Sequence, residues 1–379
     1  MKKIILLIVL VTLIYSPMTL LAQPGFSVQS SGGYTSNVFG NYRTLPDYYT
    51  DFNVYANNDW LHENYGLRAY YDGTVTMFDR YRDKNYHNHQ VGLSYYFDLN
   101  ENGNRLNAGT GLSKRSHTDT YQWFELYETF LYVNTRIKLM NQLYGYLGLK
   151  VTNRNYTNLN VFSHWQTVSF ARISRFFDTG TTFIVEADLL SKNYNSTTEN
   201  IFIEGFPEVV TIGDDNSRQA VLLFRMAQAL SVKTGLSGQV TVRRNLSNSV
   251  RYLGTSDGFY YSDEEVFNDV FGYNAREMEL TLKQILPWKM KLSAGTMLKL
   301  KDYHNRLALD LEGNPFPDER FRNDKRWINW ITLEKTIRLS RSVDPLAVSV
   351  GWTSVNNNSN DVYYDYSTSY FSFTVSQDF

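Results

Sequence analysis

About sixteen segments of this chain alternate apolar and polar side chains, and this pattern restricts the fold more than any other feature. In segment 86–98, for example, Val91, Leu93, Tyr95 and Phe97 share one face. A period of two is the pattern of a β-strand with one apolar face. Beyond the N-terminus, no apolar run approaches the roughly 20 residues of a membrane-spanning helix. If the chain crosses a bilayer, it must therefore do so as a closed barrel, which satisfies every backbone group internally.

The connections between the predicted strands alternate between short and long. The clearest long connections are 193–217, 244–272 and 302–326. Proline cannot donate to a strand ladder, and every proline falls outside the predicted strands. The sequence therefore predicts an all-β fold: a transmembrane, antiparallel, up-and-down β-barrel of about sixteen strands (roughly 14 to 18), with short periplasmic turns and long extracellular loops.

The N-terminus has the three parts of a secretory signal peptide. Lys2 and Lys3 precede an apolar run over 4–15, and a small residue, Ala22, follows. We expect a cleaved peptide over 1–22 and a single barrel domain over 23–379. The chain has no cysteine, so its stability cannot depend on disulfides.

The C-terminal strand carries apolar residues on one face up to the last residue, Phe379. That face holds Phe371, Phe373 and Val375, and also one polar residue, Gln377. This ending resembles the closing strand of Gram-negative outer-membrane β-barrels, and segment 33–39 (GYTSNVF) resembles the first strand of several such families. The resemblance implies an outer-membrane location and a terminal strand that the barrel-assembly machinery reads, with Phe371, Phe373, Val375 and Phe379 as the assembly signal.

Charged residues on the predicted strands indicate a polar lumen. A Lys or Arg on the lipid face near the bilayer midplane costs roughly 2–4 kcal/mol, so these faces should point inward. The strand over 289–301 is the sharpest case, because its lysines alternate with apolar residues. The predicted lumen-lining residues are Glu277, Glu279, Lys283, Lys289, Lys291, Lys299, Lys301, Glu186, Asp188, Arg225 and Arg243.

These features favour a porin-like channel for passive or selective passage of small solutes. Two alternatives stay open: a structural or interaction barrel that binds a surface or secretion partner through its long loops, and a secreted soluble glycan-binding β protein. Outer-membrane lipid, lipopolysaccharide and the barrel-assembly machinery are the expected partners. The net charge of −1 argues against nucleic acid.

No chemical motif in the sequence carries an enzymatic function. Segment 254–258 matches the G-x-S-x-G pattern, but no helical periodicity follows it, as a nucleophile elbow requires. His87 and His89 are two residues apart on one strand, without further metal ligands nearby. The acidic loop over 244–272 could hold Ca²⁺ or bridge to lipopolysaccharide, although a solvated surface loop is the simpler interpretation. We therefore expect no catalytic residues, cofactor or metal.

Overall fold

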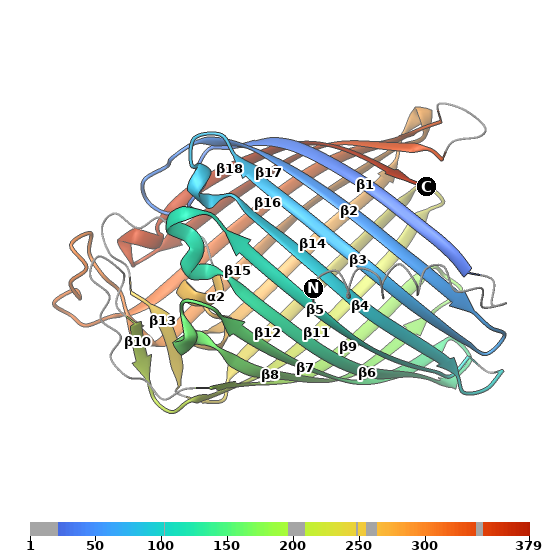
Figure 1. The fold of residues 1–379 in the computed structure, drawn as a ribbon, viewed down its shortest axis with the longest axis horizontal. Helices are drawn as coiled ribbons and strands as arrows, with labels where there is room; N and C mark the ends of the chain where they lie inside the picture. Colours follow the sequence, from blue (N-terminus) through green and yellow to red (C-terminus); the bar gives the residue numbers. More distant parts are fainter. Residues whose placement is uncertain (1–21, 102, 196–208, 248, 255–263, 339–343) are drawn as a thin grey trace, which may run out of the picture.

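The computed structural model is a closed barrel of sixteen antiparallel strands, drawn on its side in Figure 1. It describes residues 22–379 except 102, 196–208, 248, 255–263 and 339–343. The predicted peptide over 1–21 therefore lies outside the described residues. The wall strands are β1 (Ala22–Thr35), β2 (Asp47–Leu61), β3 (Tyr65–Phe78), β4 (Tyr86–Asp98), β5 (Arg105–His117), β6 (Leu126–Met140), β7 (Leu143–Tyr156), β8 (His164–Phe176), β9 (Thr181–Tyr194), β11 (Asn216–Ser231), β12 (Thr234–Asn245), β14 (Asn274–Ile285), β15 (Met290–Leu307), β16 (Phe321–Ile337), β17 (Leu346–Ser359) and β18 (Tyr366–Asp378).

Each wall strand pairs with its neighbours in sequence, and β1 pairs with β18 to close the ring. Tyr34 stands opposite Phe371 at this closure. The fold class and the strand number predicted from the alternation are confirmed. Closure leaves no strand edge unpaired, which is the condition for a sheet in a nonpolar solvent.

The two ends of the barrel differ in their connections. Short turns such as 62–64 and 141–142 lie at one end, which we call the short-turn end. The other end, the long-loop end, carries the longer connections and the small sheet formed by β10 (Val209–Ile212) and β13 (Val250–Leu253). In Figure 1 the C-terminus is at the right, and β10 and β13 are at the left.

The connections contain several short helices. These are η1 (Arg82–Lys84), η2 (Asp119–Phe124), η3 (Asn160–Phe162), α2 (Glu264–Phe267), η4 (Val270–Gly272), η5 (Pro287–Lys289) and η6 (Val362–Tyr364). Among the residues that the structure describes, no helix is both long and apolar enough to cross a membrane.

Three strand boundaries differ from the predicted ones in ways that bear on the connections and the prolines. β15 and β16 extend into the predicted connection 302–326, because backbone pairing continues past the apolar part of these strands. β1 begins at Ala22 and includes Pro24, so one proline does lie in a strand. Pro24 is near the free start of β1, where a missing donor is tolerated.

The outward face of the wall is apolar. Leu131 of β6 and Leu189 of β9 are both 61% exposed, and Val350 of β17 is 54% exposed. The inward face of β6 instead includes Glu128 and Asn134, together with the aromatic residues Phe130 and Tyr132. A secreted soluble protein would hold the opposite arrangement, with apolar side chains inside.

The terminal strand places its apolar residues outward, with Phe371 and Phe373 each 51% exposed. Phe379 and Phe26 exchange backbone hydrogen bonds of 2.7 and 3.3 Å, and their ring centroids are 5.8 Å apart. Gln377 also faces outward, at the short-turn end, and its side-chain amide donates to the carbonyl of Asp344 over 3.3 Å. The polar residue on the apolar face thus bonds to a turn at the rim.

Candidate functional site

The lumen is the candidate site, and charged residues of β12, β14 and β15 meet on its wall. Glu277 lies directly opposite Lys299 and near Arg243, and accepts a 3.0 Å contact from each. Glu279, the next inward residue of β14, accepts a hydrogen bond from Thr281 over 3.0 Å. Glu277 is thus held between two cations, and Glu279 is a second carboxylate beside it on the same face.

Further charged residues follow on the inward faces of β8, β9 and β11. Glu186 pairs with Arg172 across the β8–β9 ladder. Asp188 is the next inward residue of β9. Arg225 of β11 faces the lumen and is exposed to it. The wall therefore has both signs of charge at mid-height.

The predicted lysines are not all at the same depth. Lys301 is almost fully buried, 3% exposed, with its ammonium 4.7 Å from the ring centre of Tyr273. Lys283 and Lys291 lie towards the short-turn end, where Lys291 contacts Glu334 over 2.9 Å. Lys289 differs from the prediction: it lies in the η5 turn with a positive φ of 59°, outside the strand. Pro287 begins that turn, and the alternation resumes only at Met290.

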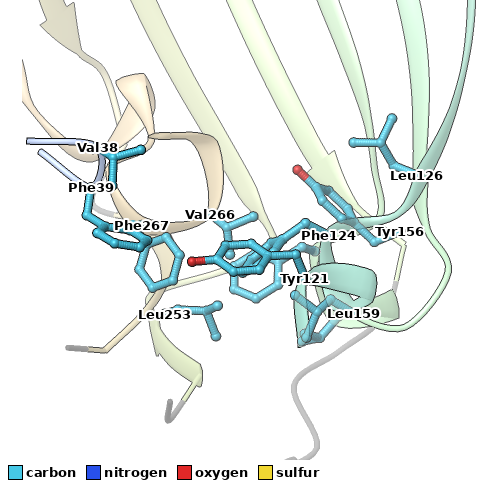
Figure 2. Packing of buried hydrophobic residues seen from close by; sticks show 12 residues of the cluster. Val38, Phe39, Tyr121, Phe124, Leu126, Tyr156, Leu159, Leu253, Val266 and Phe267 are labelled. Atoms are coloured by element: carbon cyan, nitrogen blue, oxygen red, sulfur yellow. The ribbon is translucent and has the colours of Figure 1, made fainter. Parts of the chain in front are cut away.

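The long connections form a hydrophobic core at the long-loop end, which we call the loop cluster (Figure 2). Its members come from connections and adjoining strand ends that are distant in sequence. They are Val38, Phe39, Tyr121, Phe124, Leu126, Tyr156, Leu159, Val161, Phe162, Leu253, Val266 and Phe267. The Phe124 and Phe267 rings are 6.0 Å apart. Each fully buried side chain of this kind contributes roughly 1.5–3 kcal/mol, so these loops form a packed assembly.

One part of this assembly, residues 264–272, lies against the inside of the wall. We call it the inner segment. Lys192 of β9 contacts Asp269 over 2.5 Å, and both side chains are 2% exposed. Gln219 of β11 donates to the carbonyl of Val270 over 2.6 Å, and Arg306 of β15 donates to that of Phe267 over 2.6 Å. These wall residues span β9 to β15, so the inner segment narrows the lumen along that arc.

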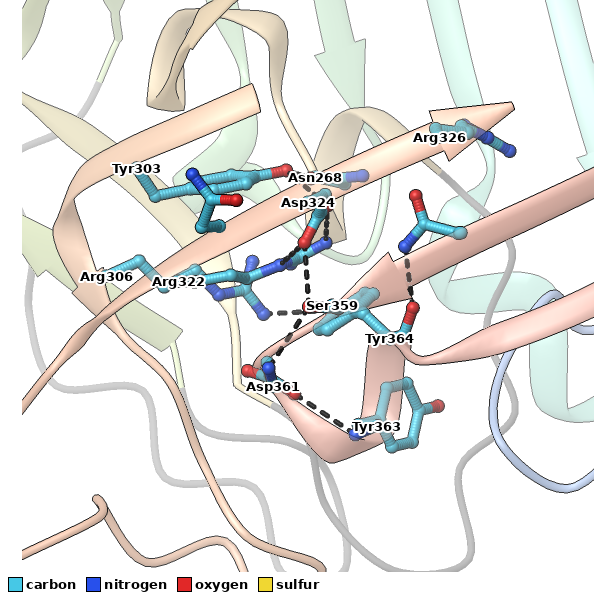
Figure 3. A network of polar contacts seen from close by, with 12 residues as sticks. Asn268, Tyr303, Arg306, Arg322, Asp324, Arg326, Ser359, Asp361, Tyr363 and Tyr364 are labelled. Carbon is cyan, nitrogen blue, oxygen red and sulfur yellow. Dashed lines mark hydrogen bonds and ion pairs between the residues drawn. The ribbon is translucent and has the colours of Figure 1, made fainter. Parts of the chain in front are cut away.

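A polar network continues the wall next to the inner segment (Figure 3). The Arg322 guanidinium donates two hydrogen bonds to the Asp324 carboxylate, over 2.9 and 2.6 Å, and stacks 3.4 Å from the ring centre of Tyr364. Ser359 donates to the same carboxylate over 2.8 Å. Within the described residues, Nη1 of Arg322 is buried without a hydrogen-bond acceptor. The Arg322 side chain is fully buried, so this donor is enclosed within the network.

Lys84 of η1 joins its own connection to the connection that holds Val38 and Phe39. Its ammonium donates to the carbonyl of Val38 over 2.9 Å and lies 4.8 Å from the ring centre of Phe39. Burial lowers the pKa of Lys84 to about 7, against the attraction of Asp47. Burial also disfavours the charged form of Asp361, next to η6, and therefore raises the pKa of its carboxyl. Both groups lie outside the wall strands.

Two neighbouring cavities lie beneath the loop cluster, and Val38 and Tyr370 line both. The larger, about 490 Å³, has an aromatic and polar lining that includes Tyr49, Asp51, Phe78, Tyr86 and Arg115. The smaller, about 270 Å³, is lined by Phe267 and Asn268 of the inner segment and by Lys301, Arg322, Asp324 and Arg326 of the wall. Three cations and one carboxylate make this second cavity positive.

Sequence reasoning missed the residues that join loops to wall. Arg322 and Asp324 are two residues apart and share a strand face, so a period of two could have predicted this pair. Lys192 and Asp269 are 77 residues apart, and nothing local relates them. Asp269 was expected in a solvated acidic loop, which is wrong, because Lys192, Tyr194 and the Phe271 amide surround it.

The other motifs gain no chemical role in the structure. His87 and His89 are exposed on the outward face of β4, with ring centres 5.0 Å apart. The described part of the chain holds no group of three or more residues that could ligate a metal. Most of the G-x-S-x-G match, 255–258, lies outside the described residues, as do Asp257 and Asp263.

No protein-family model matches the chain, and no curated protein matches it. Solved structures match its fold along almost the whole length. OccK1 (OpdK) of Pseudomonas aeruginosa shares 10% identity over 95% of this chain and 98% of its own, with a TM-score of 0.53. OpdQ of the same organism shares 9% over 94% and 97%, with a TM-score of 0.52. OpdK with vanillate shares 11% over 94% and 98%, with a TM-score of 0.51. At these identities the likeness extends to the barrel fold.

Proposed function

We propose that this protein is an outer-membrane channel, porin-like in its action, through which small solutes pass along the lumen. The observation that carries the proposal is the sorting of side chains across one closed wall. Apolar residues such as Leu131 and Leu189 face out, while charged residues such as Glu277 and Lys299 face in. A barrel of about 16 strands is wide enough to leave an aqueous passage.

The proposal includes the route to the membrane. Residues 1–22 act as a cleavable signal peptide, and 23–379 form one barrel domain. The barrel-assembly machinery reads the terminal strand through Phe371, Phe373, Val375 and Phe379. The long-loop end then faces outward, where it meets outer-membrane lipid and lipopolysaccharide. No catalytic step is involved.

Selectivity would arise where the loops narrow the lumen. Lys301, Arg322 and Arg326 line the smaller cavity. Fixed positive charge in a narrow, partly dehydrated passage favours anions. OpdK, a protein of the same fold, has been solved with vanillate, a small aromatic carboxylate. Small anionic solutes are therefore the class that we propose for this channel.

Planar-bilayer recording of the refolded protein tests this function. We expect stepwise currents. In a KCl gradient, the reversal potential should lie closer to the equilibrium potential of chloride than to that of potassium. Arg326→Gln should move that potential towards zero, because Arg326 lines the narrow region. Lys335→Gln, on the outward face of β16, is the matched control and should leave it unchanged.

One observation favours a second candidate, the interaction barrel with a blocked lumen. The loop cluster packs twelve hydrophobic side chains together at the long-loop end. Absence of any current from folded, inserted protein would reject the channel and support this alternative. Release of the protein from membranes by carbonate, without detergent, would reject both membrane functions and favour the soluble glycan-binding alternative.

A further inference from the structure

Four cationic side chains on neighbouring strands near the long-loop end point outward from the barrel wall. They are Arg218 of β11, Arg244 of β12, Arg276 of β14 and Lys325 of β16. Each is exposed, and each alternates with buried or half-buried inward neighbours, so all four point away from the lumen. We call them the outer-wall cation patch.

The four cations lie on neighbouring strands in the part of the wall nearest the long-loop end. Arg276 is directly opposite Val242, two residues from Arg244, and Ala220 is opposite Arg244, two residues from Arg218. Such diagonal neighbours are about 7–8 Å apart. Lys325 and Arg276 are both opposite Leu300, one on each side of it. At about 4.8 Å per strand, the four cations span roughly 19 Å.

The patch lies where the apolar outward face ends, near the long-loop end. Next to Arg244, Arg276 and Lys325 along their strands are the outward residues Val242, Met278 and Trp327, which are 42%, 53% and 38% exposed. Beyond Lys325 the outward residues of β16 are Asn323 and then Phe321, which is 54% exposed, and Asn358 lies directly opposite Lys325. This order, from apolar to cationic to amide, matches the boundary between acyl chains and headgroups.

The cations have no protein partner among the described residues, where their side chains take part in no hydrogen bond or ion pair. The carboxylate nearest along this outward face, Asp302 of β15, accepts a hydrogen bond from Asn323. At the short-turn end of these same strands, Lys335 is the one outward cation on β16. On these strands the outward positive charge is therefore concentrated towards the long-loop end.

We propose that the outer-wall cation patch binds the phosphorylated glycolipid of the outer leaflet, whose disaccharide carries a phosphate at each end. Several cations spread over roughly 19 Å fit two separated phosphates better than one. The amide of Asn358, directly opposite Lys325, is placed to bond the sugar. This inference rests on the proposed membrane location and adds a specific lipid site to it.

Native mass spectrometry of the folded barrel in neutral detergent, titrated with diphosphorylated lipid A, tests the site. Arg244→Gln with Arg276→Gln should weaken the apparent affinity by roughly thirtyfold, since each cation near an anionic headgroup contributes about a fivefold factor. The matched control, Arg175→Gln with Lys335→Gln, removes two outward cations near the short-turn end and should change it little. A heat-modifiable gel shift verifies that each variant is folded.

Two comparisons complete the test. Dephosphorylated lipid A should bind wild type as weakly as lipid A binds the double variant. Equal binding of phosphatidylglycerol and lipid A by wild type, or equal lipid A binding by the patch variant and wild type, would overturn the proposal. Failure of the barrel to insert into vesicles would instead reject the proposed membrane function, so the two failures are distinguishable.

Discussion

The buried ion pair between Lys192 and Asp269 should hold the inner segment in the lumen, and Asp269→Asn should release it. The two charged groups are 2.5 Å apart, with both side chains 2% exposed. Removing one partner of such a pair leaves an uncompensated buried charge and costs about 3–5 kcal/mol. Asparagine keeps the acceptor for the Phe271 amide, so the lost interaction is chiefly the charge.

This energy should appear as local opening, because the wall strands keep their complete ladders while the inner segment does not belong to them. A penalty of that size raises the open population by roughly 150-fold to 5,000-fold. Hydrogen exchange measured by mass spectrometry should show faster exchange over 266–272, with β17 unchanged, and single-channel current should rise. Replacing both partners, with Lys192→Met and Asp269→Leu, should restore most of the protection.

Unchanged exchange over 266–272 in Asp269→Asn would refute this reasoning, because the pair would then contribute nothing to the position of the segment. Equal acceleration in β17 would also contradict it, because the penalty would then be global.

Three further predictions concern the loops, the wall and assembly. The pKa of Lys84 is lowered in the folded state, to about 7, so the unfolded loop binds more protons between pH 7 and about 10.5. Protection of the 79–85 connection from exchange should therefore rise with pH in that window and be flat below it. Lys84→Met should abolish this pH dependence. A slope that persists in Lys84→Met would assign the dependence to another group. Met278→Arg places a charge on the outward face and should lower the free energy of unfolding in vesicles by about 2–4 kcal/mol. The control Met278→Leu should change this free energy little. Equal urea midpoints for the two variants would mean that Met278 does not face lipid. Phe379→Ala removes the ring contact with Phe26 and the terminal aromatic, and should reduce the barrel recovered from outer membranes more than Asp378→Ala does; equal recovery would separate Phe379 from assembly.

The wall could be predicted from the sequence because its signal is local. Each strand shows its two faces through a period of two, and neighbours in the chain are neighbours in the barrel, so no long-range information is needed. The same rule indicates that Glu277 and Lys299 share a face, and they are direct partners across β14 and β15.

The closure of the long-loop end could not be predicted in the same way. The loop cluster joins Val38, Phe124 and Phe267, which come from connections separated by most of the chain. The aromatic residues of these connections were visible in the sequence, but irregular backbone gives no period from which to assign a face. The pairing of Lys192 with Asp269 has the same origin, since it depends on how a loop returns to the wall.

The most direct test of a lumen that conducts is thiol accessibility, which this cysteine-free chain permits without background. Glu279 and Met278 are adjacent on β14 and face opposite sides of the wall. In protein reconstituted into planar bilayers, Glu279→Cys should react with a water-soluble, charged thiol reagent, and its current should change in step with the reaction. Met278→Cys should stay unmodified by the same reagent. Reaction of the Met278→Cys variant without reaction of the Glu279→Cys variant, or modification of Glu279→Cys that leaves the current unchanged, would contradict passage through this lumen.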